Sequence, residues 1–190
     1  MNLGLYGGSF DPVHLGHLLV AQAAIEELEL DRLFFIPAAQ SPFKAENETA
    51  PAETRTKLLR LALAGKTNCR LDPQELRRGG VSYAIETVRD YARRFPRSTL
   101  YYLIGADHLP QLGEWREPEA LAQLAEFAVV PRPGAPPAPF PKPFRGRVLR
   151  GFPLDLSSSQ IRARIKEGLP LDHLVPPAVA EAIRNNRLYL

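Results

Sequence analysis

The feature that most constrains this chain is its beginning, where a short apolar strand, residues 2–6, runs directly into a glycine-rich loop and a helix. Two consecutive glycines, a serine, an Asp-Pro turn and two histidines three residues apart follow the strand within residues 7–17. Glycines let the backbone approach an anion, and a helix N-terminus presents free N–H groups and the positive end of its dipole. This order predicts a strand–loop–helix cradle for phosphate, with both histidines on one helical face.

The rest of the chain alternates strands with helices, which predicts a Rossmann-like α/β fold built on a doubly wound parallel sheet. Ser82 is expected to cap the helix that follows it. We expect a single domain, 1–190, whose small C-terminal helical segment begins at about residue 155. Strands are expected at 33–36, 69–71, 100–104, 127–130 and 148–149, helices at 16–28, 53–64, 82–94 and within 107–124, and an extended surface excursion at the proline-rich 131–143.

Composition narrows the class of protein. A single cysteine excludes an internal disulfide framework and fits a reducing compartment, so we expect a cytoplasmic protein. No signal-peptide pattern and no apolar run of about 18 residues is present, so no membrane association is expected. The net charge of +3 is mild and does not by itself imply a nucleic-acid partner. Homo-oligomer formation stays open.

Several common catalytic templates are absent. The chain has no P-loop, no G-x-G-x-x-G after its first strand and no G-x-S-x-G elbow. It has only four histidines, and nothing near the first two supplies a third metal ligand, so we expect no metal held by protein side chains. Three polar segments instead follow expected strands: the opening loop, the loop from Pro37, and Gly105-Ala106-Asp107. Because the strands are expected to be parallel, these segments should meet at one edge of the sheet.

A second motif, Leu156-Ser157-Ser158-Ser159-Gln160-Ile161-Arg162, lies near the C-terminus. Ser157 and Gln160 have the spacing of a capping box at the start of a helix that ends at Gly168. Hydroxyls, free N–H groups and the Arg162 guanidinium would form a second anion site suited to a polyphosphate, although a well-capped helix alone is the plainer interpretation. Lys44 is a candidate third cation or a solvated loop lysine.

These motifs resemble the nucleotidyltransferase superfamily that is defined by a (T/H)xGH element, here His14-Leu15-Gly16-His17. Within it, the chain is most similar to bacterial nicotinate-nucleotide adenylyltransferases, over nearly its whole length. The resemblance implies that ATP and nicotinate mononucleotide are joined to give deamido-NAD and pyrophosphate in NAD biosynthesis, with Mg²⁺ carried by ATP. The middle of the chain carries the similarity to the nicotinate enzymes, through segments 37–44, 72–83, 105–115, 131–134 and 175–189.

The resemblance also implies residue roles. Four side chains would neutralise the triphosphate during catalysis: His14 and His17 at the α- and β-phosphates, and Lys44 and Arg162 at the β- and γ-phosphates. The attacking phosphate oxygen is already ionised near neutral pH, because its second pKa is about 6, so no general base is needed. The implied ATP-binding residues are Gly8, Ser9, Phe10, His14, His17, Gly105, Asp107, Arg132, Ser157, Ser158 and Arg162, and those for the mononucleotide are Gly7, Ser9, Lys44, Ser82, Tyr83, Ala84 and Trp115.

The acceptor half departs from the family pattern at two positions. Ala84 stands where the family commonly has threonine, and Phe43 stands where it commonly has histidine. Adenylyltransferases for nicotinamide mononucleotide or phosphopantetheine remain alternatives, although pantetheine enzymes usually carry Pro-Gly-Ser-Phe-Asp in place of Gly-Gly-Ser-Phe-Asp. A non-catalytic nucleotide- or RNA-binding module is a further alternative, but no aromatic-rich strand accompanies the arginine-rich segments, so we expect no nucleic-acid partner.

Overall fold

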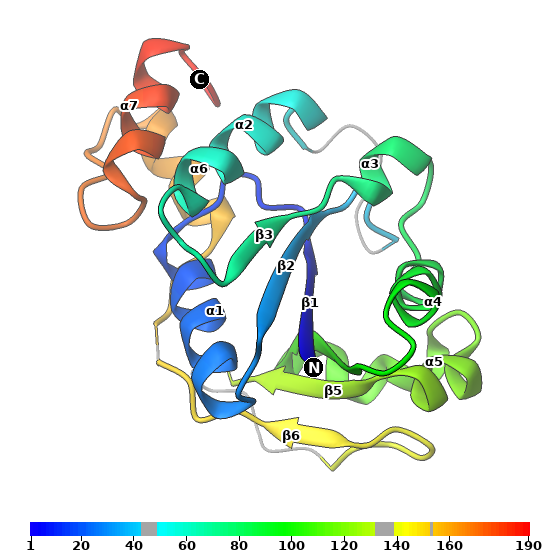
Figure 1. Cartoon of the computed structure of the whole chain (residues 1–190). Helices are drawn as coiled ribbons and strands as arrows, with labels where there is room; N and C mark the ends of the chain where they lie inside the picture. The colour runs from blue at the N-terminus through cyan, green and yellow to red at the C-terminus, as the bar shows by residue number, and fades with distance from the viewer. Residues whose placement is uncertain (43–48, 132–138, 153) are drawn as a thin grey trace.

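The computed structural model describes residues 1–42, 49–131, 139–152 and 154–190. Its centre is a six-stranded sheet in the order β3-β2-β1-β4-β5-β6, and every neighbouring pair of strands is parallel (Figure 1). The predicted doubly wound α/β fold is therefore confirmed. The strands are β1 (Asn2–Gly8), β2 (Arg32–Pro37), β3 (Cys69–Leu71), β4 (Thr99–Gly105), β5 (Glu126–Val130) and β6 (Gly146–Val148).

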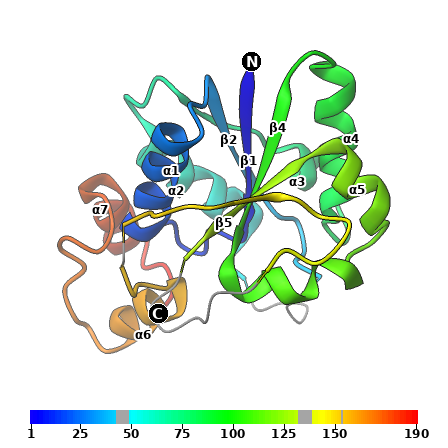
Figure 2. The ribbon, with the colours of Figure 1, turned by 90° about the horizontal axis from the view of Figure 1, so that it is seen from below.

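Helices cover both faces of the sheet, as the figures show (Figure 1, Figure 2). On one face lie α1 (Leu15–Glu27), α2 (Ala52–Leu63), α6 (Ser158–Lys166) and α7 (Pro177–Asn185). On the other lie α3 (Gln74–Arg78), α4 (Ala84–Arg94), the 3₁₀ helix η1 (Ala106–Glu114) and α5 (Pro118–Leu124).

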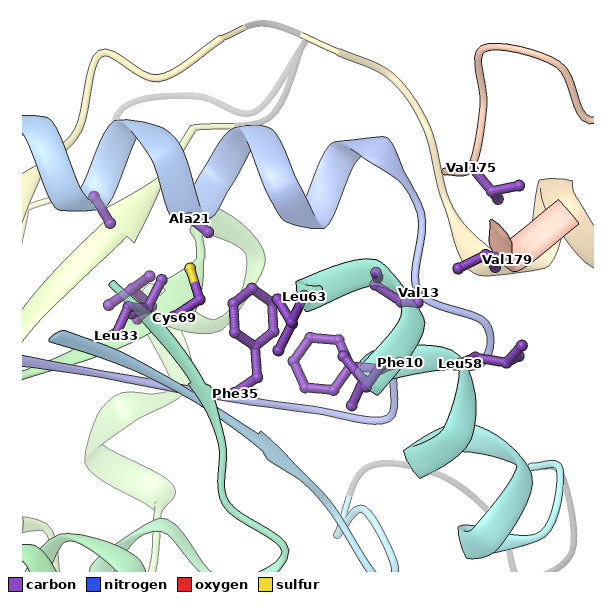
Figure 3. Close-up of a cluster of buried hydrophobic side chains, with 14 of the residues drawn as sticks. Phe10, Val13, Ala21, Leu33, Phe35, Leu58, Leu63, Cys69, Val175 and Val179 are labelled. Atoms are coloured by element: carbon purple, nitrogen blue, oxygen red, sulfur yellow. The ribbon is translucent and has the colours of Figure 1, made fainter. Parts of the chain in front are cut away.

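The core has two parts, one on each face, because alternate side chains of a buried strand point to opposite sides. Phe35 and Leu33 of β2 pack toward the α1 face together with Phe10, Leu58 and Val179 (Figure 3). Their neighbours Phe34 and Ile36 pack toward the α4 face with Tyr91 and Leu112. Burial on both sides explains why β2 is a continuous apolar run.

The chain reverses its direction of winding beside β1, whose two neighbours are β2 and β4. In open parallel sheets, ligands bind beyond the carboxyl ends of the strands at such a switch point. Gly8 ends β1 and Gly105 ends β4, so the two expected polar loops leave the sheet next to one another. The C-terminus and α6 lie at this same end, opposite the N-terminus (Figure 2).

Three local features differ from the expectations. The last strand is Gly146–Val148 rather than 148–149; a Cβ at Gly146 would lie 1.8 Å from the carbonyl oxygen of Phe127, so only glycine permits this close pairing. Ser82 does not cap α4, whose N-cap is Tyr83; the Ser82 hydroxyl instead accepts a hydrogen bond from the Ala39 N–H (2.9 Å). Helix α3 was not expected. Of the proline-rich excursion, 132–138 lie outside the described residues, and 139–143 form no helix or strand.

Candidate functional site

A cleft of about 870 Å³ opens at the carboxyl ends of the central strands. Its lining combines the loop after β1, the start of α1, residues 38–42, the start of α4, η1 and the segment before α6. The three polar segments that the sequence placed at one edge of the sheet therefore do meet there. The cleft is a candidate active site.

The floor of the cleft begins at two glycines that lie close to aromatic side chains. A Cβ at Gly7 would lie 2.7 Å from the Tyr102 hydroxyl oxygen, and one at Gly8 would lie 3.2 Å from the Phe10 ring. Phe10 has a positive φ of 47° and is buried, so its ring anchors the loop in the core while the loop backbone lines the cleft. The backbone of 7–10 is thus the surface that a ligand meets.

The two histidines lie together at the start of α1. His14 is the N-cap residue, and its backbone N–H donates a hydrogen bond to Nδ1 of His17 (3.2 Å). Because Nδ1 of His17 accepts, a neutral His17 carries its proton on Nε2. The centroids of the two rings are 3.8 Å apart with the ring planes tilted by 34°, and both rings line the cleft. The pair can therefore supply N–H donors to an anionic ligand.

The two phosphate motifs lie against one another at Gly16. A Cβ there would lie 2.9 Å from both Cε1 and Nδ1 of His14, and 3.6 Å from the carbonyl oxygen of Leu156, the residue before the serine motif. Across this contact, the Ser158 hydroxyl donates to the carbonyl oxygen of Pro12 (2.9 Å). The N-terminal loop and the C-terminal motif are therefore held against each other on one wall of the cleft.

The serine motif has the predicted local structure. Ser157 caps α6 and forms a reciprocal capping box with Gln160, and the serines at 157–159 line the cleft. The Arg162 guanidinium is placed behind them: it donates to the carbonyl oxygen of Asp11 (2.8 Å) and to the Ser159 hydroxyl (3.3 Å), and is not among the lining residues.

A buried network that the sequence analysis missed supports this wall. The Asp11 carboxylate is 1% exposed and accepts hydrogen bonds from the Tyr189 hydroxyl (2.8 Å) and the Ala50 N–H (3.2 Å). The buried Arg55 guanidinium donates to the carbonyl oxygens of Ser9 (2.8 Å) and Ala50 (3.0 Å). Burial lowers the pKa of Arg55, and the nearby Asp11 charge opposes that shift. These contacts join the phosphate loop to the last residues of the chain.

The other end of the cleft holds the predicted acceptor residues. Ser82, Tyr83, Ala84 and Trp115 all line it. Trp115 packs edge-on against Tyr102, with ring centroids 6.1 Å apart. Gly105 and Asp107, which the resemblance implies for ATP, also line the cleft, whereas Lys44 and Arg132 lie outside the described residues.

Glu75 is a second feature that the sequence analysis did not include among the site residues. It is buried at the acceptor end of the cleft and accepts a hydrogen bond from the Thr87 hydroxyl. Burial raises the pKa of Glu75, although hydrogen bonds from Thr87 and Ser82 and the charge of Arg78 act in the opposite direction. Glu75 precedes the expected acceptor segment, which begins at Ser82. Its position in the sequence was therefore a signal for a carboxyl group in the site.

The resemblance implies a Mg²⁺ ion, and the side chains of the cleft show whether protein ligands could hold it. Among the described residues, no three histidine, cysteine, aspartate or glutamate side chains gather as a cation site. A Mg²⁺ ion prefers phosphate oxygens and water to an all-protein cage, so this donor set fits an ion that arrives with a nucleotide triphosphate. No helix within the described part of the chain is long and apolar enough to span a membrane.

Comparison with known proteins identifies the class. The family described as cytidylyltransferase-like matches residues 5–164. A solved Plasmodium falciparum nicotinic acid mononucleotide adenylyltransferase complexed with NaAD has a TM-score of 0.79 at 18% identity, covering 99% of this chain and 97% of that one. At that identity the likeness concerns the fold alone. The chain is thus a cytidylyltransferase-like protein with the fold of a mononucleotide adenylyltransferase.

Relatives of higher identity narrow this class. A protein of *Opitutus terrae* is 44% identical, with 100% of this chain and 98% of the relative covered. One of *Thermus thermophilus* is 41% identical, with both chains fully covered. Both bear the name "Probable nicotinate-nucleotide adenylyltransferase". The chain belongs to the nicotinate-nucleotide adenylyltransferase family, as its motifs predicted.

Proposed function

We propose that this chain transfers the adenylyl group of ATP to nicotinate mononucleotide and releases deamido-NAD and pyrophosphate. The observation that carries the proposal is the pairing of two anion-binding motifs across Gly16, at the switch point of the sheet, with an aromatic acceptor end in the same cleft. Family membership supports the choice of substrates. We place the reaction in the cytoplasm, which the single cysteine supports.

The proposed reaction is an in-line displacement at phosphorus. An ionised phosphate oxygen of the mononucleotide attacks the α-phosphorus of ATP, a new P–O bond forms, and the bond from the α-phosphorus to the oxygen bridging the α- and β-phosphates breaks. Pyrophosphate leaves with that electron pair. No proton has to be removed from the nucleophile, because its second pKa is about 6. Catalysis then consists of alignment and of neutralising charge.

The residues of the cleft have separate proposed roles. His14 and His17 donate N–H groups to the α- and β-phosphates, and the backbone of 8–10 and the serines at 157–158 complete the cradle. Mg²⁺ bound to the triphosphate would supply further charge neutralisation. Arg162 and Lys44 are proposed for the β- and γ-phosphates; Arg162 can reach them by exchanging its carbonyl contact for phosphate oxygens, past Ser159.

The acceptor roles complete the proposal. Trp115 stacks on the pyridine ring, and the backbone of 82–84, at the start of α4, receives the ring carboxylate. Gly7 and Ser9 border the acceptor phosphate. Gly105 and Asp107 meet the ATP ribose, and Arg132 is proposed for the adenine side.

The test is a pyrophosphate-release assay with Mg²⁺-ATP and three acceptors: nicotinate mononucleotide, nicotinamide mononucleotide and phosphopantetheine. We expect the highest kcat/KM with nicotinate mononucleotide; an equal or higher value with either alternative would refute the acceptor assignment. His17→Ala should lower kcat by about 10²-fold or more, the usual effect of losing one preorganised donor. A near-normal kcat for this variant would show that the histidine pair is structural.

A further inference from the structure

The charge of the cleft is unusual for one that binds two anions. Its described lining contains four carboxylate side chains, but only one lysine or arginine, Arg116. This residue was not among the sequence-predicted site residues. The carboxylates are Glu75, Asp107, Glu114 and Asp155.

Arg116 lies at the acceptor end, immediately after Trp115. Its guanidinium carbon is 4.6 Å from the centroid of the Tyr83 ring, and its Nη1 lies 3.2 Å from Oε1 of Glu86. Tyr83 is the N-cap of α4, and Glu86 is in the first turn of that helix. The guanidinium is thereby fixed beside the free N–H groups at the start of α4, the proposed binding point of the ring carboxylate.

The ion pairs around Arg116 leave positive charge for a ligand. The other carboxylate oxygen of Glu86, Oε2, is 2.9 Å from Nε of Arg78. One carboxylate therefore faces two guanidinium groups, and this set of three side chains carries a net charge of +1. Glu86 keeps a partner if Arg116 turns toward a ligand. The Arg116 side chain is 52% exposed, so that movement needs no opening of the core.

We propose that Arg116 is a specificity-determining residue that favours an acceptor with a ring carboxylate over one with a ring carboxamide. The inference rests on the proposed function and adds to it a residue that distinguishes the two mononucleotides by charge. A guanidinium attracts a carboxylate and forms charge-assisted hydrogen bonds with it, whereas a carboxamide is neutral. The phosphate and ribose of the two acceptors are identical, so a residue that contacted only those groups would not separate them.

The experiment compares kcat/KM for nicotinate and nicotinamide mononucleotides, at saturating Mg²⁺-ATP, in the wild type and in Arg116→Gln. We expect the substitution to lower kcat/KM for nicotinate mononucleotide by about tenfold, chiefly through KM, since a half-exposed charge pair is partly screened. The value for nicotinamide mononucleotide and the KM for ATP should change little. Arg116→Lys should restore part of the preference.

Arg89→Gln is the matched control. Arg89 lies on α4, the helix that carries Glu86, and is also ion-paired with a glutamate, Glu117, but it does not line the cleft. The Arg89→Gln substitution removes the same charge from the same region and should keep the wild-type preference for nicotinate mononucleotide. A long-range effect of net charge would instead change both variants alike, and would overturn the inference.

Other outcomes are equally decisive. An equal fall for both acceptors in Arg116→Gln would mean that Arg116 binds their shared phosphate or only supports the fold, and would overturn the inference while the proposed function stood. An unchanged ratio of the two kcat/KM values would do the same. A wild-type protein that transfers adenylyl to neither mononucleotide would overturn the proposed function and this inference with it.

Discussion

Replacing Gly16 by alanine should separate activity from stability. Gly16 is the second residue of α1 and has an ordinary backbone conformation, so alanine is compatible with the helix there. Gly→Ala at such positions stabilises proteins by roughly 0.4–1 kcal/mol, because the unfolded chain loses conformational freedom. The new methyl group, however, would lie 2.9 Å from two atoms of the His14 ring.

That contact displaces the histidine pair that we propose as catalytic. Ordinary contact begins at 3.4 Å, so the His14 ring must move away by several tenths of an ångström. His14 is 5% exposed and its ring centroid lies 3.8 Å from that of His17, so the movement is transmitted to its neighbour. Since a displacement of 1 Å in a catalytic group can lower a rate by about 10²-fold, we expect kcat to fall by roughly 10-fold to 100-fold. The free energy of unfolding should stay within about 1 kcal/mol of the wild type.

The assay pairs steady-state pyrophosphate release with urea unfolding of the same preparations. Gly113→Ala is the control, because Gly113 is also in a helical segment and a Cβ there meets nothing within 4 Å. It should leave kcat unchanged. Wild-type kcat in Gly16→Ala, or a loss of activity that only follows a loss of folded protein, would refute the argument.

Two further predictions concern buried carboxyl groups. Tyr189→Phe should lower the free energy of unfolding by about 1.5–3 kcal/mol in urea titrations, because the Asp11 carboxylate loses a buried hydrogen bond; an unchanged midpoint would contradict the role of the network. Glu75→Gln should gain stability relative to the wild type as the pH rises from about 4 to about 8. The pKa of Glu75 is raised in the folded state above its ordinary 4.5, so its favourable contribution is complete below that value and is lost as the pH rises through the raised pKa. A stability difference independent of pH would show that Glu75 titrates normally.

The sequence predicted those parts of the site that are built from local chain geometry. The order of strands and helices, the loop after β1 and the capping box at Ser157 each follow from residues within a few positions of one another. Family resemblance added the acceptor segment, whose residues line the cleft. The sequence analysis did not predict helix α3, because its five residues are too few to show a helical period and Pro73 precedes them.

The missed parts depend on contacts between residues far apart in the chain. Arg55 and Ser9 are 46 positions apart, and Tyr189 and Asp11 are 178 apart, so no periodicity links either pair. Arg162 illustrates the same limit. Its place one turn into α6 was predictable, but its direction is set by the Asp11 carbonyl oxygen, which only the folded chain brings near.

These long-range contacts also distinguish the parts of the cleft that we propose for the triphosphate and for the acceptor ring. The proposed ATP half is assembled between the first loop and the end of the chain, through Ser158 to Pro12 and through Tyr189 and Arg162 to Asp11. The acceptor half is assembled within the middle of the chain, where Arg116 reaches the first turn of α4. In the proposed arrangement, different elements therefore orient the triphosphate and the acceptor ring, and the loop after β1 borders both substrates. Changes of acceptor preference can then arise at the start of α4 without altering the triphosphate cradle.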